Sequence, residues 1–201
     1  MFDAFTKTTG LCLMLAVGAI GAMTIVGEYS TGLIRTTFAA VPARRSVMAA
    51  KMIVVTAVTA AFGAVVSAAS FGVTQAILSG RHAGLSIGFP GALRVVVAST
   101  LLAPVSALVG LGLGAVIRHS ATTMVATFVI LLLLPTALSA NHHWTAVVDH
   151  AMPFNAWARL AQANAWPADY PSTITGAWIV YAVWSLAAAI LAVTTVHHRD
   201  Q

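Results

Sequence analysis

The sequence EYSTGLIRTTFAAVPARRSVMAAK, residues 28–51, decides how this chain is organised, because it is charged, broken by a proline and flanked by long apolar runs. It carries four cations, Arg35, Arg44, Arg45 and Lys51. Placing them at mid-bilayer would cost about 2.5 to 3.5 kcal/mol each, or about 10 kcal/mol together. This 28–51 connector is therefore predicted to lie in water or at a membrane surface, whereas the flanking runs can span a bilayer.

The connector also carries the pattern of a short amphipathic helix. Its apolar residues recur at roughly helical spacing and would form one stripe (Leu33, Ile34, Phe38 and Val41). Ser30 or Thr31 could cap the start of this helix, and Pro42 would end it. Two interpretations stay open on the residues alone. The helix could lie on the cytoplasmic membrane face with its arginines held by lipid phosphates, or it could dock a soluble partner.

Composition assigns the chain to the integral membrane proteins. Of 201 residues, 59% are hydrophobic and only 7% are charged, and the mean hydropathy is +0.91, which is too apolar for a water-soluble fold. The net charge of +5 is scattered over short loops, so nucleic-acid binding is not expected. The single cysteine, Cys12, excludes an internal disulfide and is interpreted as a packing residue.

Apolar runs predict an all-α polytopic transmembrane bundle that forms one domain over residues 1–201. Five spans are expected, at about 8–26, 52–76, 93–117, 121–140 and 174–196. A cleaved signal peptide is the rival interpretation of the first run, but its flank lacks the expected positive charge. Small residues in the second run (Gly63, Ser67, Ala68, Gly72) and glycines in the third (Gly110, Gly112, Gly114) are interpreted as helix-packing positions. Pro104 is expected to kink the third run.

The polar loop 141–173 is rich in tryptophan and proline, which is typical of short helices at a membrane interface. Cations then orient the bundle. Six fall in loops on one side (Arg35, Arg44, Arg45, Lys51, Arg118, Arg199) and four on the other (Lys7, Arg81, Arg94, Arg159). The bias predicts an N-terminus and loop 141–173 outside the cell, with the connector, the Arg118 turn and the C-terminus in the cytoplasm.

A family resemblance rests on the connector. The string Glu28-Tyr29-Ser30-Thr31-Gly32-Leu33-Ile34-Arg35, followed by Pro42, Arg44-Arg45 and Lys51, resembles the segment after the second span in ABC transporter permeases of the type-2 drug and polysaccharide exporter superfamily, most of all in actinobacterial members. A weaker similarity extends over nearly the whole chain. Family permeases usually have six spans, so the resemblance also implies that the first span is missing, through a late start, a truncation or a natural short form.

The resemblance implies a function, partners and site residues. This chain would be the permease subunit of a multi-pass exporter in the plasma membrane, forming a homodimer or heterodimer with a second permease subunit and coupling to a separate ABC ATPase. The implied ATPase-coupling residues are Glu28, Tyr29, Gly32, Ile34, Arg35, Phe38, Pro42, Arg44, Arg45 and Lys51. Ile34 and Phe38 would dock by apolar contact, with Glu28 and Arg35 orienting the helix, and the three C-terminal cations would bind the ATPase or membrane lipid.

Catalytic chemistry has no candidate residues. A phosphate-binding loop ending in Gly-Lys-Ser/Thr is absent, so ATP hydrolysis is expected in the partner and the chain is not expected to be an enzyme. The histidines lack the spacing of a metal site on any predicted span, and no nucleophile-base triad or cofactor motif is recognised. The alternative function is a non-transporting membrane scaffold or regulatory subunit.

Overall fold

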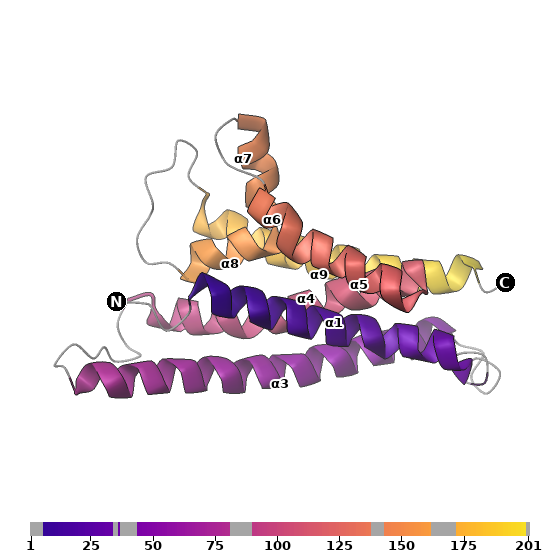
Figure 1. The fold of residues 1–201 in the computed structure, drawn as a ribbon, viewed down its shortest axis with the longest axis horizontal. Helices are drawn as coiled ribbons and strands as arrows, with labels where there is room; N and C mark the ends of the chain where they lie inside the picture. Colours follow the sequence, from indigo (N-terminus) through magenta and orange to yellow (C-terminus); the bar gives the residue numbers. More distant parts are fainter. Residues whose placement is uncertain are drawn as a thin grey trace.

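A computed structural model describes residues 6–33, 36, 44–80, 90–137, 143–161 and 172–199, and within these ranges it contains helices and no strands (Figure 1). Five helical segments are long and apolar enough to cross a membrane, which confirms the predicted all-α class with five membrane-length helices. They are α1 (Lys7–Thr31), α3 (Arg44–Ser79), α4 (Ala92–Ile117), the continuous segment of α5 (Ser120–Phe128), η1 (Val129–Leu133) and α6 (Leu134–Ala137), and α9 (Ile174–Arg199). Two short helices, α7 (His143–His150) and α8 (Pro153–Ala161), precede α9.

The helices reach further into the connector than the apolar runs indicate. α1 continues through Glu28 to Thr31, and α3 already begins at Arg44. With 36 residues, α3 is about 54 Å long at 1.5 Å per residue, which exceeds the roughly 30 Å of a hydrocarbon core. Both ends of the connector are therefore extensions of the flanking long helices.

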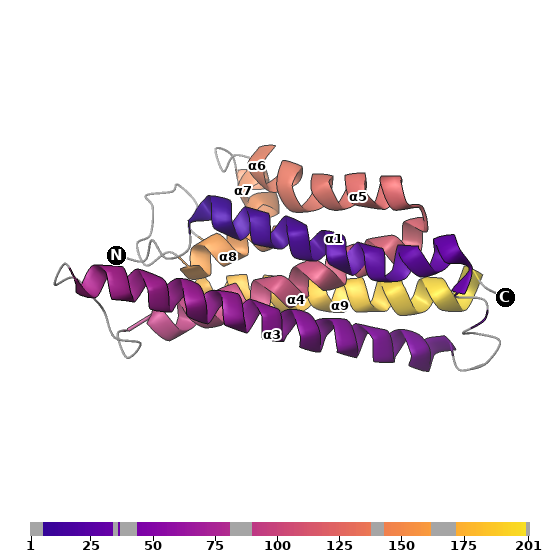
Figure 2. The same ribbon diagram turned by 60° about the horizontal axis from the view of Figure 1, so that its bottom comes forward.

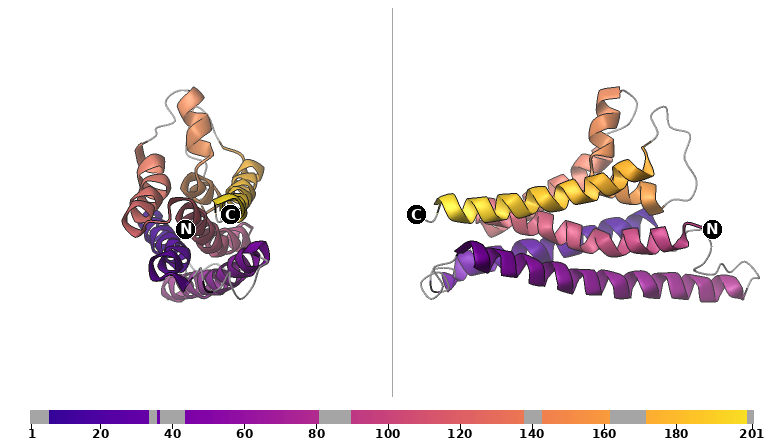
Figure 3. Two further views of the ribbon diagram at one scale, coloured as in Figure 1. Left: turned by 90° about the vertical axis from the view of Figure 1, so that its right-hand side faces the viewer. Right: turned by 180° about the vertical axis from the view of Figure 1, so that it is seen from behind.

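Helix α4 forms the centre of the bundle. About 67% of its most apolar stretch is buried, against 44% for α1 and 22% for each of the other three segments. The end-on view in Figure 3 shows α1, α3, α5 and α9 arranged around it, and Figure 2 shows α3 crossing one side of the bundle. Apolarity alone does not account for this position, because an apolar span can equally face lipid; the small residues of α4 let neighbouring helices pack closely on it.

Glycines bring α1 and α4 into backbone contact. A Cβ built on Gly21 would lie 2.0 Å from the carbonyl oxygen of Ala107, and one on Gly110 would lie 1.9 Å from that of Gly18. On the other side of α4, a Cβ at Gly112 would lie 3.0 Å from the carbonyl oxygen of Ala188 in α9. The interpretation of the third-run glycines as helix-packing residues is confirmed.

Helix α3 approaches α4 next to its internal proline. Because Pro104 has no N–H, it cannot donate to the carbonyl oxygen of Thr100 one turn earlier, yet α4 continues as one helix through this point. Gly63 lies there, and its added Cβ would be 2.4 Å from the Thr100 oxygen. Of the small residues expected on this packing face, Gly63 and Ser67 are buried. Ala68 and Gly72 are instead exposed, so that part of the prediction is wrong.

The fourth membrane-length segment contains a π-helical turn, η1, before Pro135. Leu131 in this turn is fully buried and would meet a Cβ added to Gly18 of α1 at 2.7 Å. The wider π-helical turn thus directs the Leu131 side chain toward the place where α1 and α4 are in contact. Such turns arise where the regular helical ladder is interrupted, here just ahead of a proline.

Candidate site at the ends of α1, α3 and α4

Three helix ends meet at one end of the bundle. They are the C-terminal end of α1, the N-terminal end of α3 and the turn between α4 and α5, all on the right in Figure 1. Polar side chains from α1 bind both neighbours: Glu28 contacts Lys51 of α3, and Tyr29 contacts Arg118 of the turn. We refer to these four residues as the end cluster.

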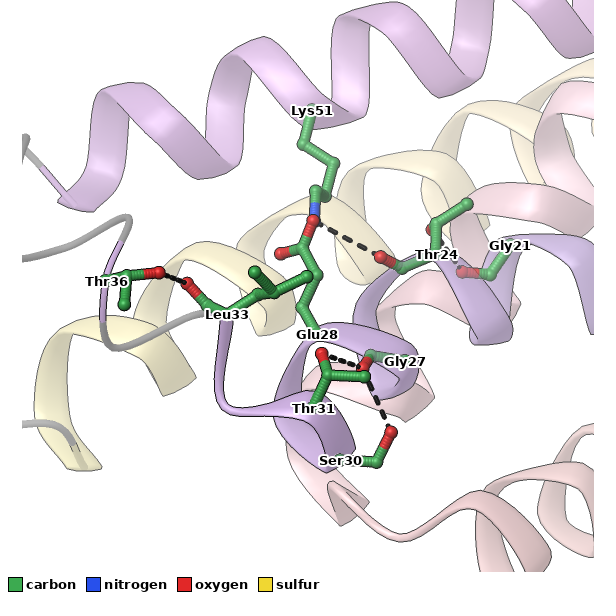
Figure 4. Close-up of polar contacts among 9 residues, drawn as sticks. All are labelled: Gly21, Thr24, Gly27, Glu28, Ser30, Thr31, Leu33, Thr36 and Lys51. Atoms are coloured by element: carbon green, nitrogen blue, oxygen red, sulfur yellow. Dashed lines mark hydrogen bonds and ion pairs between the residues drawn. The ribbon is translucent and has the colours of Figure 1, made fainter.

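An ion pair links α1 to α3. The ammonium Nζ of Lys51 contacts Oε1 of Glu28 and also donates a hydrogen bond of 3.2 Å to the main-chain oxygen of Thr24 (Figure 4). Thr24 precedes Glu28 by one helical turn, so a single ammonium group binds two successive turns of α1. The lysine side chain is 18% exposed and the glutamate 34% exposed, which shields the pair partly from solvent. A cation near the C-terminal turns of α1 is also favoured by the helix dipole.

A cation–π contact links α1 to the α4–α5 turn. The guanidinium carbon Cζ of Arg118 lies 4.6 Å from the centre of the Tyr29 ring, within the range of such contacts. Arg118 ends α4 in a left-handed conformation (φ 58°), and its N–H donates to the carbonyl oxygen of Gly114 at 2.9 Å. This conformation is uncommon for a residue other than glycine, and here it turns the chain directly into α5.

The residues expected to couple to an ATPase divide into two groups. Ile34, Arg35, Phe38 and Pro42 lie outside the described residues, and with them most of the expected amphipathic helix. The other six belong to the helix ends: Glu28 and Tyr29 in the last turn of α1, Gly32 as its left-handed C-cap with φ 72°, and Arg44, Arg45 and Lys51 in the first turns of α3. The expectation that Ser30 or Thr31 caps a following helix is wrong. Both lie inside α1, where their hydroxyls donate to the main-chain oxygen of Gly27 at 2.9 and 2.8 Å.

Sequence reasoning placed the Arg118 turn on the same side as the connector, but it missed two contacts: that of Arg118 with Tyr29 and that of Thr24 with Lys51. Arg118 is far from Tyr29 in the sequence, and no local signal connects them. Thr24 takes part only through its main-chain oxygen, which no sequence pattern reveals. The Glu28–Lys51 pair did leave a signal, since an acid and a base stand at the two ends of one connector.

The opposite end of the bundle contains the short helices predicted for loop 141–173. Helix α8 packs into the core there, and Trp157 is 1% exposed, with its indole nitrogen donating to Oγ of Ser99 at 3.0 Å. The expectation that this tryptophan lies at the membrane interface is therefore wrong: its ring fills the space next to Gly10, where an added Cβ would lie 2.4 Å from it. Arg94 fixes the end of α8 by donating to the main-chain oxygen of Leu160 at 3.2 Å.

The ion pair of the end cluster yields a first prediction. Reversing one charge, as in Glu28→Lys, should weaken the bundle, and the double exchange Glu28→Lys with Lys51→Glu should recover part of the loss, because a glutamate at 51 cannot donate to the Thr24 oxygen. We expect a coupling free energy of about 0.5 to 1 kcal/mol, because the pair is partly shielded but not buried. The measurement is a double-mutant cycle on unfolding in mixed micelles. Additive single effects would show that the two side chains contribute independently.

The chain was compared with protein-family models, curated proteins and solved structures, and none of them matches it. The resemblance of the connector to exporter permeases therefore rests on the residues of this chain alone.

Proposed function

We propose that this chain is the membrane-spanning permease subunit of an ATP-binding-cassette exporter, which pairs with a second permease subunit and couples to a separate ABC ATPase. The 28–51 connector would face the cytoplasm and contact the ATPase, with Ile34 and Phe38 as its apolar docking residues. The proposed orientation of the chain, with the N-terminus outside, rests on the cation bias in the loops, and the plasma membrane is the location that the family resemblance implies.

The end cluster is the observation that carries this proposal. Both ends of the connector are continuous with membrane-length helices, and Glu28–Lys51 joins those two helices to each other. Tyr29–Arg118 then joins α1 to the end of α4, the central helix. A push on the connector would therefore act on three packed helices together.

The proposed mechanism is a free-energy linkage. ATP binding closes the ATPase pair, which moves the connectors of two permease subunits toward each other. The end cluster passes that displacement into α1, α3 and α4, whose glycine contacts let them move as a packed unit. Nucleotide can shift the bundle only by as much as the bound ATPase prefers one arrangement of the connectors over the other.

The docking role predicts that Ile34→Asp with Phe38→Asp abolishes co-purification with an ABC ATPase. Each apolar side chain that is buried in the interface with the ATPase would contribute about 1.5 to 3 kcal/mol to binding, and a carboxylate in its place would add a desolvation cost. The measurement is affinity purification from native membranes, followed by mass spectrometry for peptides with a phosphate-binding loop. Thr36→Asp with Ala39→Asp is the matched control, because it adds the same two negative charges on the opposite face of the expected helix, and it should leave the ATPase bound.

Two outcomes would contradict the proposal. Undiminished ATPase recovery with the double variant would show that these residues do not dock it. Efficient labelling of Arg45→Cys from outside intact cells would put the connector on the wrong side of the membrane. The alternative, a non-transporting scaffold, would retain ATPase binding, but reconstituted vesicles containing both proteins would show no ATP-dependent transport.

A further inference from the structure

A cavity of about 350 Å³ lies at the end of the bundle opposite the end cluster, between the last turn of α7, the start of α8 and the first turns of α9. Its volume lies at the lower end of the range typical of ligand pockets, about 300 to 1,000 Å³. Its described lining includes the apolar residues Val147, Ala177 and Val180 and the polar residues His150 and Ser172. The cavity is formed by residues that the proposed transport function does not use.

Three of the described polar side chains of this wall can donate a hydrogen bond. The imidazole of His150 and the hydroxyls of Ser172 and Thr173 can each donate. The Thr173 oxygen already accepts from the main-chain N–H of Gly176 at 3.0 Å, which leaves its own proton for another acceptor. An acceptor with several lone pairs on one small group therefore suits these donors.

Asn155 offers only an acceptor to the cavity. Its amide nitrogen donates to the main-chain oxygen of Asp149 at 3.1 Å and to Oδ1 of the same residue at 2.7 Å, so both amide protons have acceptors. Burial raises the pKa of Asp149 above its ordinary value, and the neighbouring His150 opposes that shift. The carboxyl group of Asp149 is thus held by Asn155 and is not part of the cavity wall.

An arginine outside the cavity binds one of its lining residues. Nε of Arg159 in α8 donates to the main-chain oxygen of Ser172 at 2.7 Å, which ties the guanidinium to a residue that lines the cavity. Arg159 of α8 is therefore bonded to a lining residue, and His150 at the end of α7 lines the cavity directly. Together with the hydroxyl donors, they favour an anionic group there.

We propose that this cavity binds a small amphiphilic carboxylate, with its head at His150, Ser172 and Thr173 and its short apolar tail against Val147, Ala177 and Val180. The carboxylate oxygens accept from the imidazole and the two hydroxyls. The tail covers apolar wall that would otherwise contact water. This inference does not depend on the exporter assignment, since the site lies at the other end of the molecule.

Cysteine protection tests this proposal with a matched pair of positions. Cys12, the chain's single cysteine, is first replaced by alanine, and Val147→Cys or Val148→Cys is then introduced. Both valines are exposed on α7, at 53% and 43%, but only Val147 lines the cavity. The full chain is reconstituted in phosphatidylcholine vesicles, which carry no anionic lipid, and is labelled with a water-soluble maleimide in the presence of hexanoate, hexylamine or hexanol.

Hexanoate should slow the labelling of Val147→Cys and leave that of Val148→Cys unchanged. At twice its dissociation constant, it occupies two thirds of the sites and slows labelling about threefold. Adding His150→Leu, which keeps bulk but removes the donor, should abolish this protection while the labelling rate without probe is retained.

Three results would overturn the proposal. Equal protection by hexanol or hexylamine would show that no carboxylate is recognised. Slowing of both cysteines would mean that hexanoate acts on the membrane or the reagent and not at the cavity. Absence of protection at any soluble hexanoate concentration would show that no such site exists.

Discussion

Replacing Gly21 with alanine is expected to separate α1 from α4 and to destabilise the bundle by about 1 to 3 kcal/mol, the usual cost of overpacking. The added methyl would lie 2.0 Å from the main-chain oxygen of Ala107 and 2.7 Å from its carbonyl carbon. Backbone atoms cannot move aside as a side chain can, so the helices themselves must shift. Alanine's better helix propensity, worth up to about 1 kcal/mol, offsets only part of this cost.

Gly27 in the same helix is the matched control. Among the residues that the structure describes, nothing lies within 4 Å of a Cβ built there, so Gly27→Ala gains helix propensity without a collision and should be neutral or stabilising. Unfolding of each variant by increasing dodecyl sulfate in mixed micelles, followed by circular dichroism, measures the difference. Gly110→Ala, whose methyl would lie 1.9 Å from the Gly18 oxygen, should behave like Gly21→Ala. Equal stability of Gly21→Ala and Gly27→Ala would contradict the close approach of α1 and α4.

Truncating Trp157 to alanine is expected to cost about 3 to 5 kcal/mol, as is typical of a large buried aromatic residue. Its ring packs beside Gly10 and against Phe154, whose ring centre is 5.6 Å away, and its indole nitrogen binds the Ser99 hydroxyl. Trp157→Phe keeps most of the ring but leaves Ser99 without its donor, so we expect a smaller loss of about 1 to 3 kcal/mol. Trp184→Ala, at a partly exposed indole, should cost less than Trp157→Ala.

Fluorescence gives an independent measurement of the same burial. In a variant that keeps Trp157 and has phenylalanine at the other four tryptophans, the emission maximum should lie at short wavelength, and aqueous acrylamide should quench it poorly. A tryptophan at headgroup depth would contact water and be quenched efficiently. Strong quenching, together with a small effect of Trp157→Ala, would restore the interfacial interpretation.

Much of the fold could be predicted because hydropathy acts locally. A run of about 20 apolar residues gains from leaving water wherever its neighbours lie, and in lipid its backbone must satisfy its own hydrogen bonds as a helix. The packing role of the third-run glycines could also be predicted. Glycines at three alternate positions of one helix leave room for backbone contact on more than one side, here with α1 and with α9. The ends of α1 and α3 were harder to predict, because Glu28–Thr31 and Arg44–Lys51 contain charged and polar residues yet are helical where α1 and α3 pair.

The candidate site could be predicted only in part. An acid at residue 28 and a base at residue 51 marked the two ends of the connector, but their direct pairing depends on how α1 and α3 are rotated about their axes. Arg118 joins Tyr29 because α4 is the central helix and ends in a left-handed residue beside α1. Residues distant in sequence meet through such packing, which a hydropathy pattern does not encode.

The sequence by itself determined the class of this protein: an all-α chain with five membrane-length helices and a cationic connector too polar for lipid. Only the tertiary structure decided which face of each helix is buried, so Gly63 packs while Gly72 does not, and Trp157 joins the core instead of the interface. The physical reason is that transfer from water depends on the sum of local residues, whereas close packing depends on the rotation and register of helices that meet across the whole chain.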